Sequence, residues 1–121
     1  MIKSNAIVVT GGLLDTGNAK TAHGLIRGTE RFNILAIIDD QHAGKDAGEI
    51  LDGVYRGIPV FTTIADFVAS KGKIATYCII GVATKGGVIP PSLQEILKQA
   101  LDHDLNLVNG LHEYVSEIPL L

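Results

Sequence analysis

Short apolar runs alternate with helix-like stretches along the chain, and this alternation limits the fold more than any other feature. Four runs are rich in β-branched residues and lack polar alternation, as strands do when helices cover both faces of a parallel sheet. They span residues 6–10, 34–38, 58–61 and 77–82, and a fifth, more polar run spans residues 105–108. Between the runs, residues 21–27, 43–51, 63–70 and 92–103 have helical character.

Capping residues mark the starts of two of these helices. Thr63 and Asp66 have the spacing of a capping box at the start of the 63–70 stretch. A second capping pattern begins at Ser92, directly after two prolines, and the apolar residues that follow recur three and four positions apart. The helices are therefore expected to begin at or next to these residues.

The order of the elements predicts an α/β domain: a Rossmann-like, doubly wound parallel sheet of five strands in the order 3-2-1-4-5, with helices on both faces. A chain of 121 residues that is 46% hydrophobic is long enough for one core, and we expect a single domain over residues 1–121. In such sheets ligands bind beyond the carboxyl ends of the strands, between the first and fourth strands. The loops that follow the strands are therefore the expected site.

Charge and cysteine content exclude several classes of protein. Ten Lys and Arg against thirteen Asp and Glu give a net charge of −3, whereas a nucleic-acid surface is basic. Cys78 is the only cysteine, which excludes an internal disulfide and a multi-cysteine zinc site. No apolar stretch has the length of a membrane span, so we expect a cytoplasmic protein that binds neither membranes nor nucleic acids. No metal site is expected, because the His and acidic residues match no ligand spacing.

The loop after the first strand is predicted to bind an anion. Glycines let backbone N–H groups approach a phosphate, and the following helix adds its positive N-terminus. The sequence matches neither G-x-G-x-x-G nor the P-loop, and the alternative is a long turn with a solvated lysine. The residues predicted to contact a ligand here are Gly11, Gly12, Gly17, Asn18, Lys20 and Thr21.

Asp39 at the end of the second strand lies 22 residues after Gly17, near the position at which dinucleotide-binding folds place a ribose-binding acid. The alternative is that this carboxylate caps the next helix. Lysines 20, 45 and 85 each lie in a different strand-end loop among glycines. They are predicted to converge on a diphosphate, a triphosphate or a coenzyme A anion, although solvated lysines are common on exposed loops.

Two further loops complete the predicted ligand contacts. Ala83, Lys85, Gly86 and Gly87 follow the fourth strand and are expected to form the opposite wall. Gly110 and His112 follow the fifth strand, and His112 is an acid–base candidate because histidine titrates near neutrality. The alternative for His112 is a hydrogen-bonded histidine at a helix start. Cys78 lies in the middle of a strand, where an inert buried thiol is expected.

Five ordered motifs carry a resemblance to a known family. They are residues 20–25, 42–48, 56–59, 80–83 with Gly86-Gly87 and Pro90-Pro91, and 110–113. The chain resembles the N-terminal Rossmann-like domain of a family of unknown function, some of whose members are described as D-glutamate N-acetyltransferases. The resemblance implies a C-terminal P-loop domain, which this sequence, ending at Leu121, does not include. By motif alone it makes His23, His42, Lys45 and His112 functional candidates, the three histidines as candidate catalytic residues.

Three functions are therefore considered. The first is a ligand-binding domain in an N-acyltransferase-like protein. Its ligand, a nucleotide or acyl-coenzyme A, is also the expected cofactor. The second is a non-catalytic module that oligomerises or docks onto a P-loop domain, and a homo-oligomer is expected. The third is a nicotinamide-dependent oxidoreductase, supported only by Asp39 and by analogy of fold.

Overall fold

The computed structural model describes residues 3–70, 74–82, 91–109 and 114–115. In chain order its elements are β1 (Ser4–Val9), the 3₁₀ turn η1 (Gly17–Ala19), α1 (Lys20–Arg27), β2 (Phe32–Ile38), α2 (Ala47–Asp52), β3 (Val60–Phe61), α3 (Ile64–Ala69), β4 (Tyr77–Ile80), α4 (Pro91–Asp102), β5 (Asn106–Asn109) and β6 (Tyr114–Val115). Within these ranges, no helix has the length and apolar character needed to cross a membrane.

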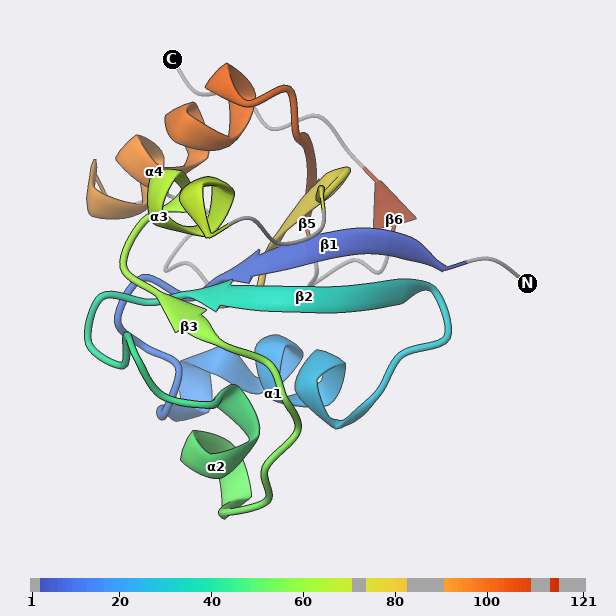
Figure 1. The fold of residues 1–121 in the computed structure, drawn as a ribbon, viewed down its shortest axis with the longest axis vertical. Coiled ribbons are helices and arrows are strands. Elements are labelled where there is room, and N and C mark those ends of the chain that lie inside the picture. The colour runs from blue at the N-terminus through green and yellow to red at the C-terminus, as the bar shows by residue number, and fades with distance from the viewer. Residues whose placement is uncertain (1–2, 71–73, 83–90, 110–113, 116–121) are drawn as a thin grey trace.

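The strands form one sheet in the order β3-β2-β1-β4-β5-β6. The first five are parallel in the predicted order 3-2-1-4-5, and β6 adds an antiparallel edge next to β5 that the sequence did not predict. Figure 1 shows α1 and α2 on one face of the sheet and α3 and α4 on the other. The doubly wound architecture is therefore confirmed, with one strand more than expected.

β1 is the centre of the core. Its residues 6–9 are fully buried, because β2 and β4 flank it and helices cover both faces. Fully burying one such aliphatic side chain contributes roughly 1.5–3 kcal/mol. The uninterrupted apolar run that predicted a parallel strand is the direct consequence of this position.

The edge strand β3 is covered by the chain that precedes α2. Gly44 donates its N–H to the carbonyl of Val60 at 2.9 Å, Val60 donates to the carbonyl of Lys45 at 3.0 Å, and Ala47 donates to the carbonyl of Ile58 at 2.8 Å. These bonds satisfy backbone groups that an open edge would expose. The prediction of a helix from residue 43 was therefore wrong at its start, since residues 43–46 are used to close the sheet and α2 begins at Ala47.

The predicted starts of the other two helices had different outcomes. Thr63 accepts a hydrogen bond from the N–H of Asp66 at 3.1 Å, which confirms it as the N-cap of α3. α4 begins at Pro91, one residue before the predicted start. Proline is favoured in the first turn because its missing N–H has no helical acceptor there.

Gly81, directly after β4, lets α1 pack closely on the sheet. Its carbonyl accepts a hydrogen bond from the N–H of Ala22 at 3.1 Å. A Cβ atom at Gly81 would lie 2.5 Å from Val8 Cγ1 and 2.9 Å from Ala22 Cβ, whereas a Cβ atom at Gly24 within α1 would meet nothing within 4 Å. The first position therefore requires glycine and the second does not.

We expect Gly81→Ala to lower the free energy of unfolding by about 1–3 kcal/mol, because the methyl group overpacks a closed contact. Gly24→Ala should raise it by up to about 1 kcal/mol, because alanine favours the helix. Chemical denaturation of both variants and the parent measures the difference. Equal stability of the two variants would contradict the close packing at Gly81.

Candidate functional site

A buried carboxylate organises the carboxyl edge of the sheet. Asp39 follows β2 and is fully buried. Its Oδ2 accepts three hydrogen bonds from the chain that follows β1: from the Thr10 hydroxyl at 2.6 Å, from the Gly12 N–H at 3.1 Å and from the Leu14 N–H at 3.0 Å. The loops after β1 and β2 are thus joined through one oxygen atom.

The other oxygen of this carboxylate binds its own loop. Oδ1 of Asp39 accepts a hydrogen bond from the N–H of Gln41 at 3.0 Å and lies 2.9 Å from Nδ1 of His42. Nε2 of His42 lies 3.4 Å from Oδ2 of Asp15, whose side chain is largely exposed on the loop after β1. His42 therefore lies between two carboxylates, one from each of these loops.

These contacts determine the ionisation of Asp39. Burial alone raises the pKa of this carboxyl group. Hydrogen bonds from Thr10, His42 and the N–H groups of Leu14 and Gln41 more than offset that effect and hold the pKa below its usual value. Asp39 is therefore a permanent anion within the fold at neutral pH.

The structure changes the roles predicted for the glycine-rich loop after β1 and for Asp39. Gly11 and Gly12 adopt the positive φ angles, 57° and 91°, that allow their turn. The N–H groups of Gly12 and Leu14, however, already bind an anion, the Asp39 carboxylate. The ribose contact predicted for Asp39 is wrong, because the carboxylate is buried and both oxygens are occupied from within the chain.

A groove of 450 Å³ runs beside α1 on the surface of the sheet. We call it the α1 groove, and it is lined by Lys20, Thr21, Gly24, Leu25, Gly28, Thr29, Arg31, Phe32, Ile79 and Val108. Lys20 and Thr21 were predicted from the sequence. Thr29 and Arg31 were not predicted, because they precede β2 and ligand contacts were expected only beyond the carboxyl ends of the strands. Gly17 and Asn18 lie in η1, directly before α1.

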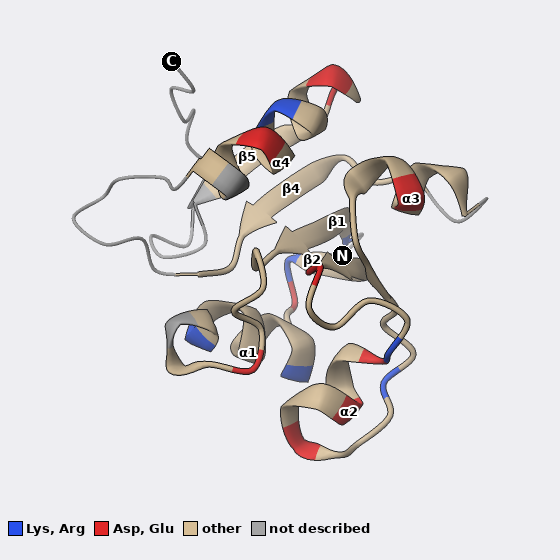
Figure 2. Cartoon of the chain, turned by 90° about the vertical axis from the view of Figure 1, so that its left-hand side faces the viewer, with Lys and Arg blue, Asp and Glu red and all other residues tan. Residues whose placement is uncertain are grey.

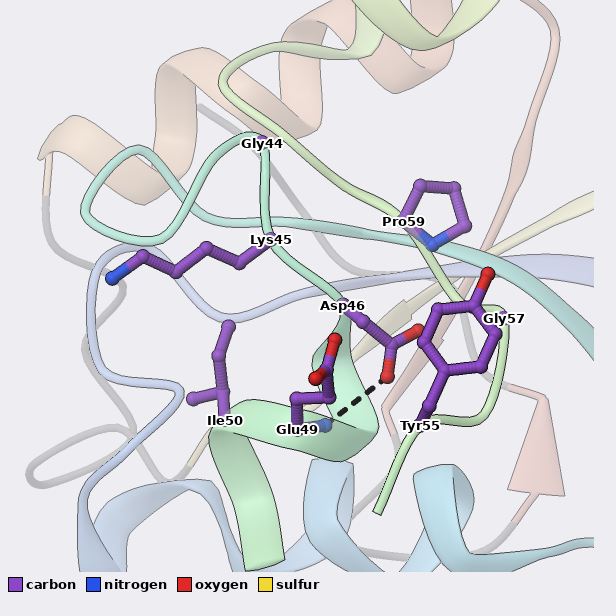
Figure 3. A pocket seen from close by; sticks show the side chains of 8 residues that line it. All are labelled: Gly44, Lys45, Asp46, Glu49, Ile50, Tyr55, Gly57 and Pro59. Carbon is purple, nitrogen blue, oxygen red and sulfur yellow. Dashed lines mark hydrogen bonds between the residues drawn. The ribbon is translucent and has the colours of Figure 1, made fainter. Parts of the chain in front are cut away.

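A second hollow, of 860 Å³, lies beside α2 (Figure 3) and is lined by Gly44, Lys45, Asp46, Glu49, Ile50, Tyr55, Gly57 and Pro59. Lys45 lines this α2 hollow, whereas Lys20 lines the α1 groove. The two lysines therefore line different hollows, and their convergence on one phosphate-bearing ligand stays a prediction. Lys85, the third, lies outside the described residues.

The structure shows what surrounds His23 and Cys78, whose roles were considered from the sequence. Nε2 of His23 lies 2.6 Å from the carbonyl oxygen of Leu14, so this ring holds the loop after β1 against α1. Burial raises the pKa of the Cys78 thiol to about 12, which makes it unreactive at neutral pH. The remaining predicted site residues lie outside the described residues: Ala83, Gly86, Gly87, Gly110 and His112.

The fold and these motifs agree with comparisons to known proteins. The profile of a family described as "Domain of unknown function (DUF1611_N) Rossmann-like domain" matches residues 40–121. The chain belongs to this family. The DUF1611_N chain is also similar to a DUF1611 family protein from Anabaena variabilis ATCC 29413, known from a crystal structure, with 32% identity and a TM-score of 0.78. None of the curated proteins compared with the chain matches it significantly.

The similarity to the Anabaena protein covers 98% of this chain and 33% of that one. The DUF1611_N chain thus spans about a third of the length of its relative. Neither description names a ligand or a reaction, so the function must be argued from the site.

We expect Asp39→Asn to lower the free energy of unfolding at pH 7 by about 2–4 kcal/mol, because the amide leaves backbone donors without a charged acceptor. Asp40→Asn, the exposed neighbour, is the matched control and should be nearly neutral. Urea denaturation followed by circular dichroism measures both variants. Equal effects at the two positions would refute the structural role of Asp39.

Because Asp39 is an anion in the folded state, we expect the stability of the domain to depend on pH in the acid range. Because the pKa of Asp39 is lowered in the folded state, its contribution to stability is complete above the unfolded-state pKa of about 3.9. That contribution is lost as the pH falls from there through the folded-state pKa. Unfolding free energies measured at descending pH should therefore fall less steeply for Asp39→Asn than for the parent, and parallel curves would contradict the assignment.

Proposed function

We propose that this DUF1611_N domain binds a phosphate-bearing ligand, a nucleotide or an acyl-coenzyme A, in the α1 groove. The observation that carries the proposal is the position of Lys20, which is the first residue of α1 and lines the groove. Figure 2 shows basic residues at both ends of this helix. A lysine at a helix N-terminus adds a full positive charge to the partial charge of the first N–H groups, and phosphates bind such positions.

The floor of the α1 groove supports a ligand with a long apolar part. Leu25, Phe32, Ile79 and Val108 line it, and Arg31 lies over the ring of Phe32 at 5.2 Å from the centroid. Its volume of 450 Å³ is within the range of about 300–1,000 Å³ typical of small-molecule sites. Coenzyme A combines phosphates with an extended arm, which suits a cationic end and an apolar floor.

The activity that this binding would serve is N-acyl transfer related to D-glutamate N-acetylation, as the resemblance of the five motifs suggests. In that reaction the domain would hold the acyl donor. Since the chain spans a third of the length of the Anabaena relative, we propose the complete reaction for the longer protein and not for this domain alone. His23 and His42, the candidate acid–base residues within the described part of the chain, are not among the residues that line the α1 groove, so we assign neither of them a step in the transfer.

The second candidate function is a non-catalytic module that docks onto a P-loop domain. The observation in its favour is the same length difference, because in the Anabaena protein the matching region is one third of a longer chain. Mixing this domain with a separately produced P-loop domain of a longer relative tests the idea by calorimetry. The third candidate, nicotinamide binding, loses its main support because Asp39 is not available to a ribose.

We expect titration calorimetry to detect binding of coenzyme A or ATP at millimolar concentration or below. Lys20→Gln should weaken this binding about tenfold, through loss of one charge-assisted contact. Gly24→Leu should abolish it by filling the groove, and should fold normally because nothing lies within 4 Å of the new Cβ atom. Lys98→Gln on α4 is the control and should bind as the parent does.

Reduced nicotinamide cofactors form a further arm of this experiment, read by their fluorescence. Tight binding of these cofactors alone would favour the oxidoreductase alternative. Absence of any binding by a domain that circular dichroism shows to be folded would overturn the proposal.

A further inference from the structure

The loop between α2 and β3, residues 53–57, is held by a second buried carboxylate. Asp46 accepts hydrogen bonds from the N–H groups of Glu49 at 3.1 Å, Arg56 at 3.0 Å and Ile58 at 2.8 Å. Burial raises the pKa of this carboxyl group, but the backbone hydrogen bonds outweigh burial and lower the pKa overall. One anion thus caps α2 and anchors the far end of the 53–57 loop.

An ion pair and a close packing contact hold the loop from the other side. Arg56 binds both oxygens of Asp52 through Nη1 and Nη2, at 2.7 Å and 3.0 Å. The carbonyl oxygen of Val54 lies so close to α2 that a Cβ atom at Gly48 would be 2.2 Å from it. The loop therefore has a defined conformation before any partner binds.

This ordered loop presents apolar side chains to solvent. Tyr55 is 72% exposed and Val54 is 54% exposed. A tyrosine on a preorganised loop is a favourable binding anchor, because little conformational entropy is lost when it is covered. The exposed pair on a rigid support indicates a protein contact surface.

The α2 hollow lies directly beside the tyrosine. Figure 3 shows Lys45 and Tyr55 on opposite sides of it, with Glu49 between them. Within the described residues, neither Lys45 nor Glu49 forms an ion pair. A largely exposed aromatic residue at the edge of a hollow and two opposite charges that form no ion pair within the described residues therefore share one surface. Figure 2 shows the acidic residues of α2 beside basic residues of the neighbouring chain.

We propose that this surface binds the same surface of a second copy of the chain about a two-fold axis. In that arrangement Tyr55 of each copy enters the α2 hollow of the other, and Lys45 faces Glu49 of the partner subunit. A two-fold interface joins one patch to itself, so an exposed side chain and the hollow that receives it must lie on the same patch, as Tyr55 and the α2 hollow do. A complementary charge pair on the same patch satisfies the same condition. The surface is lined by residues other than those of the α1 groove, so this inference stands or falls independently of ligand binding.

Sedimentation velocity from micromolar to sub-millimolar concentration tests the proposal. We expect the parent chain to dimerise, and Tyr55→Ser to weaken the dimer at least tenfold, as loss of an anchor residue does. Val68→Ser, which changes another exposed apolar residue on α3, is the matched control and should dimerise as the parent does. A parent chain that stays monomeric throughout, or equal effects of the two variants, would overturn the proposal.

A charge exchange identifies the two-fold pairing. Lys45→Glu and Glu49→Lys should each weaken the dimer, because each places like charges opposite one another. The double variant should restore it, because the opposite charges then meet with their positions exchanged. Failure of the double variant to recover, while circular dichroism shows all three variants folded, would overturn the proposed arrangement.

Discussion

The hydrogen bonds to the buried carboxylate of Asp39 are the interactions on which the carboxyl edge of the sheet depends. An ionised group without solvent is costly unless its hydrogen bonds are replaced, and here Thr10, Gly12 and Leu14 replace them on one oxygen and Gln41 and His42 on the other. The loops after β1 and β2 can only satisfy this anion together. The position of the chain leading into α1 is therefore set by a residue at the end of β2.

This internal anion also separates the glycine-rich loop from the site that we propose for an external one. The glycine-rich loop has the conformation and the N–H groups of an anion site, but its anion is supplied by the protein itself. The positive charge that remains is on side chains beside α1, above all Lys20, and the apolar floor of the α1 groove lies next to it. Asp46 has a similar role: its buried carboxylate accepts backbone hydrogen bonds and orders the loop that carries Tyr55. Two buried carboxylates thus shape two separate surfaces.

Comparison of particular elements shows why some predictions from sequence succeeded and others failed. Thr63 capped its helix as predicted, because the cap is formed with a residue only three positions away. Residues 43–46 did not form a helix, because their N–H and carbonyl groups pair with β3 and close the sheet edge. Among the predicted ligand residues, Lys20 and Thr21 lie together in the α1 groove, whereas Lys45 lies in another hollow. Side chains from different loops meet only where the packing of the intervening helices brings them.

The sequence by itself determined the five parallel strands, their order and the two faces of helices, but not the edge strand β6. Apolar runs and local capping are properties of neighbouring residues, and the rules for parallel α/β sheets then give the order. It also identified Asp39 as a notable acid at a strand end. Only the tertiary structure decided what that acid does, since its partners Thr10, Gly12 and Leu14 are 25 to 29 residues away in the chain. A carboxylate exposed to a ligand and one buried as an internal anion have the same spacing in sequence, and they differ only in which donors the folded chain brings to them.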